Sequence, residues 1–103
     1  MYTRETIIEK VNILKKRLIE AGFEITDIYL FGSYYNNSNN EYSDIDIAII
    51  AENFTGIRFY DIEKIAEYKL DLVDFEIHPF KKSDFEEGNP FIQHIKENSK
   101  KIA

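Results

Sequence analysis

The sequence lacks cysteine, long hydrophobic runs and any concentration of positive charge. Without cysteine the chain can form neither disulfides nor thiolate metal sites, which is typical of a cytoplasmic protein. No apolar run approaches the ~18 residues that span a bilayer, so no membrane segment is expected. These absences predict a cytoplasmic protein whose stability does not depend on covalent cross-links.

The charge of the chain is acidic and dispersed. The formal net charge is −6, and the lysines and arginines are scattered along the sequence. Proteins that bind nucleic acids usually concentrate positive charge, so a nucleic-acid substrate is not expected. Hydrophobic residues make up 44% of the chain and aromatic residues 15%, which is typical of a packed globule. A length of 103 residues predicts a single domain over residues 1–103.

Helical and strand patterns alternate along the chain, which predicts an α+β fold. Apolar residues at spacings of three and four predict a first helix, Thr3 to Ala21, with Thr3 as its N-cap. Asn89-Pro90 has the residue types that begin a helix and predicts the last one. The remaining expected elements are strands at 25–31, 44–50 and 70–78, helices at 57–69 and 83–87, and a short helix or turn from residue 33.

The stretch from residue 30 to 50 contains the residues with the clearest chemical roles. Gly32 permits a tight turn and a close approach of the backbone to a ligand. Ser33 offers a hydroxyl and, at a helix start, unpaired backbone N–H groups that favour phosphate. Asp44 and Asp46 stand two residues apart, so on a strand they lie on one face. A polar end on an otherwise apolar strand is typical of a functional site.

Two carboxylates on one face of a strand repel each other. At ~4 Å and an effective dielectric constant of ~20, the cost is roughly 4 kcal/mol. Magnesium relieves this repulsion, because it prefers one or two carboxylates together with phosphate oxygens of the substrate. Asp44 and Asp46 beside the Gly32-Ser33 turn therefore predict a site for Mg²⁺ and a triphosphate.

This stretch resembles the signature of a known family. Gly32-Ser33, ten further residues and then Asp44-Ile45-Asp46 resemble the DNA polymerase beta-type nucleotidyltransferase superfamily, and most of all its minimal nucleotidyltransferase (MNT) domains. The resemblance implies the nucleotidyltransferase fold, with a small mixed β-sheet of about three strands packed by about four helices. It also implies two Mg²⁺ ions, ATP as the substrate, and a β- and γ-phosphate site at Gly32 and Ser33.

The family pattern also bears on the rest of the site. By resemblance, Asp44 and Asp46 bind both metal ions, and a third carboxylate comes from the third strand. Asp74 is our prediction for that catalytic and metal-binding residue, because in polymerase beta-type enzymes the corresponding Asp stands five residues before a proline. Asp71 and Glu76 remain alternatives. Many relatives carry an arginine soon after Gly-Ser, whereas this chain has tyrosine at positions 34 and 35.

The acceptor of the transferred nucleotide is not evident from the residues. The resemblance implies a helical HEPN-type partner protein, because some MNT domains are antitoxins that transfer AMP to a tyrosine of a HEPN toxin. The leading hypothesis is therefore a metal-dependent transfer of AMP from ATP to a hydroxyl on such a partner. The alternatives are an antitoxin that neutralises its partner by contact, and a small-molecule nucleotidyltransferase that acts as a homo-oligomer, in the simplest case a dimer.

Overall fold

The fold combines one mixed β-sheet with helices on both of its faces. The computed structural model describes residues 2–69 and 71–103, and no helix in these ranges is long and apolar enough to cross a bilayer. In chain order the elements are α1 (Arg4–Glu20), β1 (Ile25–Phe31), α2 (Ser33–Asn36), β2 (Ile45–Ala51), α3 (Arg58–Ala66), the 3₁₀ helix η1 (Glu67–Lys69), β3 (Phe75–Lys81), α4 (Lys82–Glu87), α5 (Pro90–Glu97) and β4 (Ser99–Lys101). The predicted α+β class is confirmed, and the sheet has one strand more than expected.

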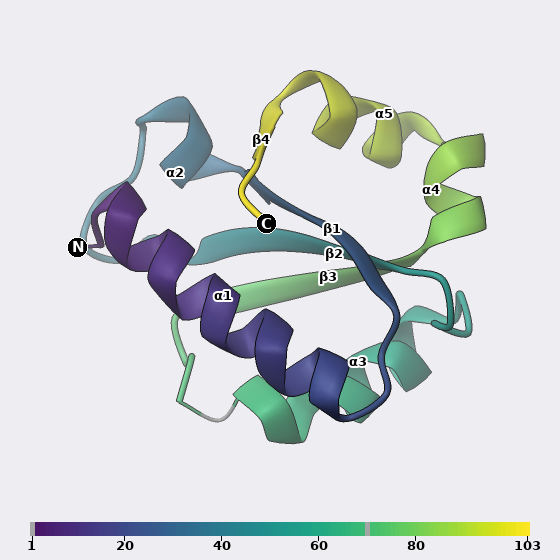
Figure 1. Ribbon diagram of the computed structural model, residues 1–103. Coiled ribbons are helices and arrows are strands. Elements are labelled where there is room, and N and C mark those ends of the chain that lie inside the picture. The colour runs from purple at the N-terminus through teal and green to yellow at the C-terminus, as the bar shows by residue number, and fades with distance from the viewer. Residues whose placement is uncertain (1, 70) are drawn as a thin grey trace.

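The four strands lie in the order β3-β2-β1-β4. β1 is antiparallel to β2 and to β4, whereas β2 and β3 are parallel (Figure 1). β2 and β3 therefore begin at the same edge of the sheet, and β1 ends there. Residues at these three strand ends are brought together although they are far apart in the sequence.

Each face of the sheet carries its own apolar core. Helices α1 and α3 cover one face, and α4 and α5 cover the other (Figure 1). On the α1 face the buried side chains include Ile7, Val11, Leu14, Leu18, Leu30, Ile47, Ile65 and Ile77. On the opposite face they are Phe31, Ala48, Ile50, Phe85, Ile92 and Ile95. A strand buried on both faces explains the near-continuous isoleucine run of β2.

The first and last helices begin where the sequence predicts. The hydroxyl of Thr3 accepts a hydrogen bond of 3.1 Å from the backbone N–H of Thr6. The amide oxygen of Asn89 accepts one of 2.8 Å from the backbone N–H of Ile92. Both side chains satisfy donors that the first turn of a helix leaves unpaired, which fixes the N-terminus of each helix.

The third strand was predicted too early, at 70–78. Residues 71–74 form a turn, and β3 runs from Phe75 to Lys81; Leu70 lies outside the described residues. In this turn Val73 is 82% exposed, whereas Leu72 is buried. Pro79 lies within the strand, which continues beyond the predicted end at residue 78. Because β3 is an edge strand, a residue without an N–H is tolerated there.

The fourth strand was not predicted. β4 has only three residues, and its pairing with β1 joins Phe31 to Ser99 and Tyr29 to Lys101. The ammonium of Lys101 lies 2.9 Å from the carboxylate of Asp27 on β1. A short, charged segment has neither the length nor the alternation by which strands are recognised in a sequence.

Candidate active site

The Gly32-Ser33 step turns the chain sharply from β1 into α2. Gly32 has φ 73° and ψ −153°, a region that essentially only glycine adopts, and it is the N-cap of α2. Its carbonyl accepts hydrogen bonds from the N–H groups of Tyr35 (3.1 Å) and Asn36 (3.0 Å). The short helix therefore begins at Ser33, as the sequence predicts.

Gly32 also lies against Asp46. Phe31 at the end of β1 pairs with Asp46 near the start of β2. A Cβ on Gly32 would lie 3.1 Å from the Cγ of Asp46 and would overlap its Oδ2 atom. The absence of a side chain at position 32 thus leaves room for the Asp46 carboxylate beside the turn.

We expect Gly32→Ala to disturb the site beyond the effect of backbone strain. Gly22→Ala is the matched control, because Gly22 also has a positive φ, 98°, but, its chain neighbours aside, no atom of the described residues lies within 4 Å of its ideal Cβ. Each variant should lose about 1–3 kcal/mol of unfolding free energy through strain. Only Gly32→Ala displaces the Asp46 carboxylate, and it should weaken binding of Mg²⁺ with ATP by ~10-fold or more. Denaturant titration and calorimetry measure the two effects, and equal binding by both variants would contradict this reading.

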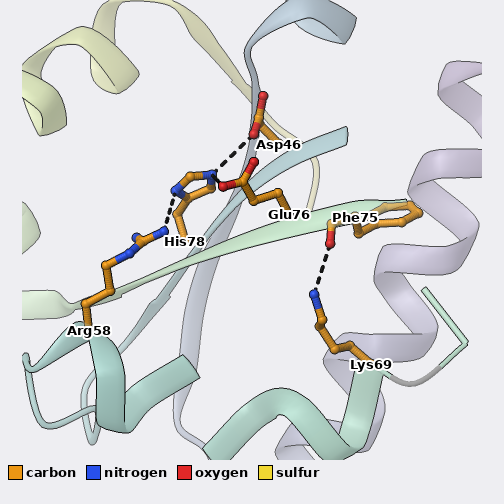
Figure 2. Close-up of polar contacts among 6 residues, drawn as sticks. All are labelled: Asp46, Arg58, Lys69, Phe75, Glu76 and His78. Carbon is orange, nitrogen blue, oxygen red and sulfur yellow. Dashed lines mark hydrogen bonds and ion pairs between the residues drawn. The ribbon is translucent and has the colours of Figure 1, made fainter. Parts of the chain in front are cut away.

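Asp46 and Glu76 are direct neighbours across the two parallel strands. The register pairs Asp46 of β2 with Glu76 of β3, so both side chains leave the same face of the sheet. Their carboxylates and the imidazole of His78 each offer an atom within 4.8 Å of the others. Figure 2 shows the three side chains pointing toward one another. The side chain of Asp46 is 24% exposed and that of Glu76 52%, which leaves the cluster open to solvent.

Asp74, predicted as the third carboxylate, lies in the turn before β3. Its Oδ2 accepts a hydrogen bond of 2.9 Å from the hydroxyl of Tyr2, and this bond raises the pKa of Tyr2. Asp44 likewise precedes its strand, and the two aspartates line a pocket with the tyrosines at positions 2, 34 and 42. The structure thus places Asp44 with Asp74, and Asp46 with Glu76.

Asp71, the other alternative, is engaged away from this edge of the sheet. Its carboxylate accepts two hydrogen bonds from the guanidinium of Arg17 on α1, of 2.7 and 3.2 Å. The same guanidinium lowers the pKa of Asp71. This pairing joins α1 to the turn before β3 and gives Asp71 a structural role.

Two residues that sequence reasoning did not select belong to the cluster. The Nε2 of His78 lies 3.2 Å from Oδ1 of Asp46. Arg58 is the first residue of α3, and its Nη2 lies 3.2 Å from the Nδ1 of His78. His78 stands two residues after Glu76 on β3, and this alternation is the one signal that places them on one face. No sequence pattern indicated that Arg58 belongs to the cluster.

A cation also lies near the Gly-Ser turn, although the family's arginine is absent there. The guanidinium of Arg4, at the start of α1, donates a 3.4 Å hydrogen bond to the carbonyl of Tyr34 on α2. Arg4 is separated from Tyr34 by thirty positions in the sequence. A motif defined by consecutive residues cannot reveal a contact of this kind.

The donor set fits magnesium. Asp46 and Glu76 supply hard carboxylate oxygens that face one another at the open edge of the sheet, and Gly32 leaves space beside them. No cysteine is present to favour a softer metal. The backbone of β3 is held at this point, because the ammonium of Lys69 donates a 3.1 Å hydrogen bond to the carbonyl of Phe75 (Figure 2).

Comparison with solved structures identifies the fold. The crystal structure of the toxin–antitoxin MntA–HpeT, in a mutant form, aligns with a TM-score of 0.61 at 20% identity, over 93% of this chain and 72% of that one. The crystal structure of a toxin–antitoxin with AMP-PNP aligns with a TM-score of 0.56 at 24% identity, over 89% and 71%. The chain therefore has the nucleotidyltransferase fold that the sequence predicts.

Comparison of sequences identifies the family. The family model described as polymerase beta, nucleotidyltransferase, matches residues 11–103, and the chain belongs to this family. A protein of Methanocaldococcus jannaschii named "Putative protein adenylyltransferase" is 30% identical over 92 residues, which cover 86% of this chain and 89% of that protein. The protein is thus a nucleotidyltransferase, and the strand ends at Gly32, Asp46 and Glu76 lie where its fold brings β1, β2 and β3 together.

Proposed function

We propose that the protein transfers AMP from ATP to a hydroxyl group on a partner protein, and that the partner is a small helical toxin of the HEPN type. The observation that carries the proposal is the pair of carboxylates, Asp46 and Glu76, that the parallel register places beside the Gly32 turn. The name of the Methanocaldococcus jannaschii relative and the toxin–antitoxin structures support the protein acceptor.

In the proposed reaction the acceptor oxygen forms a bond to the α-phosphorus of ATP. The bond between that phosphorus and the bridging oxygen to the β-phosphate breaks, pyrophosphate leaves, and the hydroxyl proton passes to solvent. Asp44, Asp46 and Glu76 would hold Mg²⁺, and the Gly32-Ser33 turn would hold the β- and γ-phosphates. Mg²⁺ held there would supply positive charge for activation of the acceptor hydroxyl and for stabilisation of the departing pyrophosphate.

Glu76 replaces Asp74 in this proposal for a geometric reason. Asp46 and Glu76 pair directly across β2 and β3, whereas the carboxylate of Asp74 is held by the hydroxyl of Tyr2. Asp44 remains in the proposed set on the resemblance of Asp44-Ile45-Asp46 to the family signature, although it lines a pocket with Asp74. The cytoplasm, where ATP and magnesium are abundant, is the proposed location.

The test starts from the neighbouring open reading frame, which we expect to encode a small helical protein, and co-expresses that protein with this chain. We expect the recovered partner to gain the mass of one or more AMP groups on a tyrosine, and the purified chain alone to turn over ATP slowly. Co-expression with the Asp46→Asn variant is the matched control and should leave the partner unmodified. An inhibited but unmodified partner would show that neutralisation occurs by contact, and label on a small molecule would overturn the protein acceptor.

A further inference from the structure

A row of three polar side chains runs from α3 to the carboxylate cluster. Arg58 contacts the Nδ1 of His78, and the Nε2 of the same ring contacts Oδ1 of Asp46, each at 3.2 Å. Figure 2 shows the imidazole between the guanidinium and the carboxylates, with Glu76 beside it. The Nε2 lies 3.8 Å from Oε1 of Glu76, so it is nearer to Asp46.

The contact of Arg58 with Nδ1 of His78 determines which atom donates in the contact of Nε2 with Asp46. A guanidinium has only N–H donors, so the Nδ1 of His78 must accept a hydrogen bond from Arg58. The hydrogen of the imidazole then resides on Nε2, which donates to Oδ1 of Asp46. A metal ion bound to Nε2 would need the opposite tautomer, in which an N–H at Nδ1 would face the N–H of Arg58. The contact with Arg58 thus opposes metal binding by His78.

The ring of His78 is held by packing as well as by hydrogen bonds. The residue is 8% exposed, and its partner across the sheet, Ala48, has a small side chain that leaves space for an imidazole. The rings of Phe31 and Phe91 lie against it, with centroids 5.0 and 6.0 Å away. An imidazole fixed in this way has little freedom to turn its other nitrogen toward the cluster.

Arg58 is fixed by the way in which α3 begins. The buried carboxylate of Asp61 accepts hydrogen bonds from the N–H groups of Thr55 (2.8 Å) and Gly56 (3.0 Å), and from the Thr55 hydroxyl (2.9 Å). These bonds close the turn that leads into the helix, of which Arg58 is the first residue. The guanidinium therefore approaches His78 from a constrained backbone position.

From this arrangement, and resting on the proposed function, we propose that His78 is a positioning residue for Asp46 and is not itself a metal ligand. Its Nε2–H holds Oδ1 of Asp46, while Oδ2 remains beside Gly32, on the side where the phosphates would bind. Arg58 acts on Asp46 indirectly, because its hydrogen bond to Nδ1 selects the tautomer of His78. The two residues orient the carboxylate, and hydrogen bonds of this kind are a general feature of metal sites.

The direct test is nitrogen NMR of the imidazoles in the full-length chain, with and without Mg²⁺. We expect the signals of His78 to show a hydrogen on Nε2 and none on Nδ1, before and after Mg²⁺ is added. The exposed His94 is an internal reference. A hydrogen on Nδ1, or the loss of the hydrogen from Nε2 when Mg²⁺ binds, would overturn the proposal. Because this measurement needs neither ATP nor acceptor, a failure of AMP transfer would count against the proposed function alone.

A second test compares two variants of His78, one that keeps a hydrogen-bond donor for Asp46 and one that lacks it. The amide of glutamine reaches about as far as Nε2, so His78→Gln keeps a donor for Asp46, whereas His78→Leu removes it. In Mg²⁺-dependent binding of AMP-PNP, His78→Leu should weaken the apparent Mg²⁺ affinity by ~10–100-fold, and His78→Gln should recover most of it. His94→Leu should have no effect. Equal losses in both His78 variants, or none, would contradict a positioning role.

If His78→Leu does not fold, a variant of Arg58 tests the same proposal. Arg58→Met removes the donor to Nδ1 and leaves the ring in place. In its imidazole signals the share of the tautomer with the hydrogen on Nδ1 should rise, although the Asp46 carboxylate still favours a hydrogen on Nε2, and the apparent Mg²⁺ affinity should fall. An unchanged single tautomer in this variant would show that Arg58 does not select it.

Discussion

Glu76→Gln is expected to lower the rate of AMP transfer by ~100-fold or more, with little effect on folding. The side chain of Glu76 is 52% exposed and pairs across the strands with Asp46, so its carboxylate is available to a metal ion. Loss of a metal ligand removes both activation of the nucleophile and stabilisation of the leaving group. The rate at saturating ATP and Mg²⁺, measured with the partner protein present, tests the expectation.

Asp74→Asn and Asp71→Asn are the matched controls for this prediction. Asp74 is bound to the hydroxyl of Tyr2, and Asp71 to the guanidinium of Arg17, so each change should mainly affect stability. Tyr2→Phe removes the hydrogen bond to Asp74 without altering the charge of the carboxylate, whereas in Asp74→Asn the charge is lost and the amide oxygen can still accept this bond. A large loss of transfer in Asp74→Asn, with normal activity in Tyr2→Phe and Glu76→Gln, would show that Asp74 is the ligand after all.

The identity of the third carboxylate, Asp74 or Glu76, could not be derived from the sequence alone. Alternation along a strand places both residues on one face, but it does not state which residue of β2 each one faces. That depends on whether β2 and β3 run parallel and on their register, which pairs Asp46 with Glu76. Both properties arise from packing between distant segments, and a single sequence carries no local signal for them.

Local signals were sufficient elsewhere. The caps of α1 and α5 and the turn at Gly32 each follow from a few consecutive residues. The prediction failed where tertiary context prevailed, as in the edge strand that accommodates Pro79. It failed also at the contact of Arg58 with His78, which joins positions twenty residues apart on different elements.

Mg²⁺ with ATP is expected to raise the free energy of unfolding by about 2.7 kcal/mol at a ligand concentration ~100 times the dissociation constant. The gain arises because ligand binds only the folded chain, in which the carboxylates of Asp46 and Glu76 face one another. The double variant Asp44→Asn with Asp46→Asn should lose this stabilisation. Thermal or denaturant unfolding with and without Mg²⁺ and ATP measures the difference.

The ligand-free stability of two Asp46 variants separates the roles of this side chain. In Asp46→Asn the amide oxygen can still accept the hydrogen of His78 Nε2, and repulsion from Glu76 disappears, so stability should stay equal or rise. In Asp46→Ala the buried Nε2–H of His78 loses its acceptor, which should cost about 1–3 kcal/mol. Both variants should bind Mg²⁺ with ATP poorly. Retention of the ligand-dependent stabilisation in the Asp44→Asn, Asp46→Asn double variant would contradict a metal site at this strand end, whatever the ligand-free stabilities prove to be.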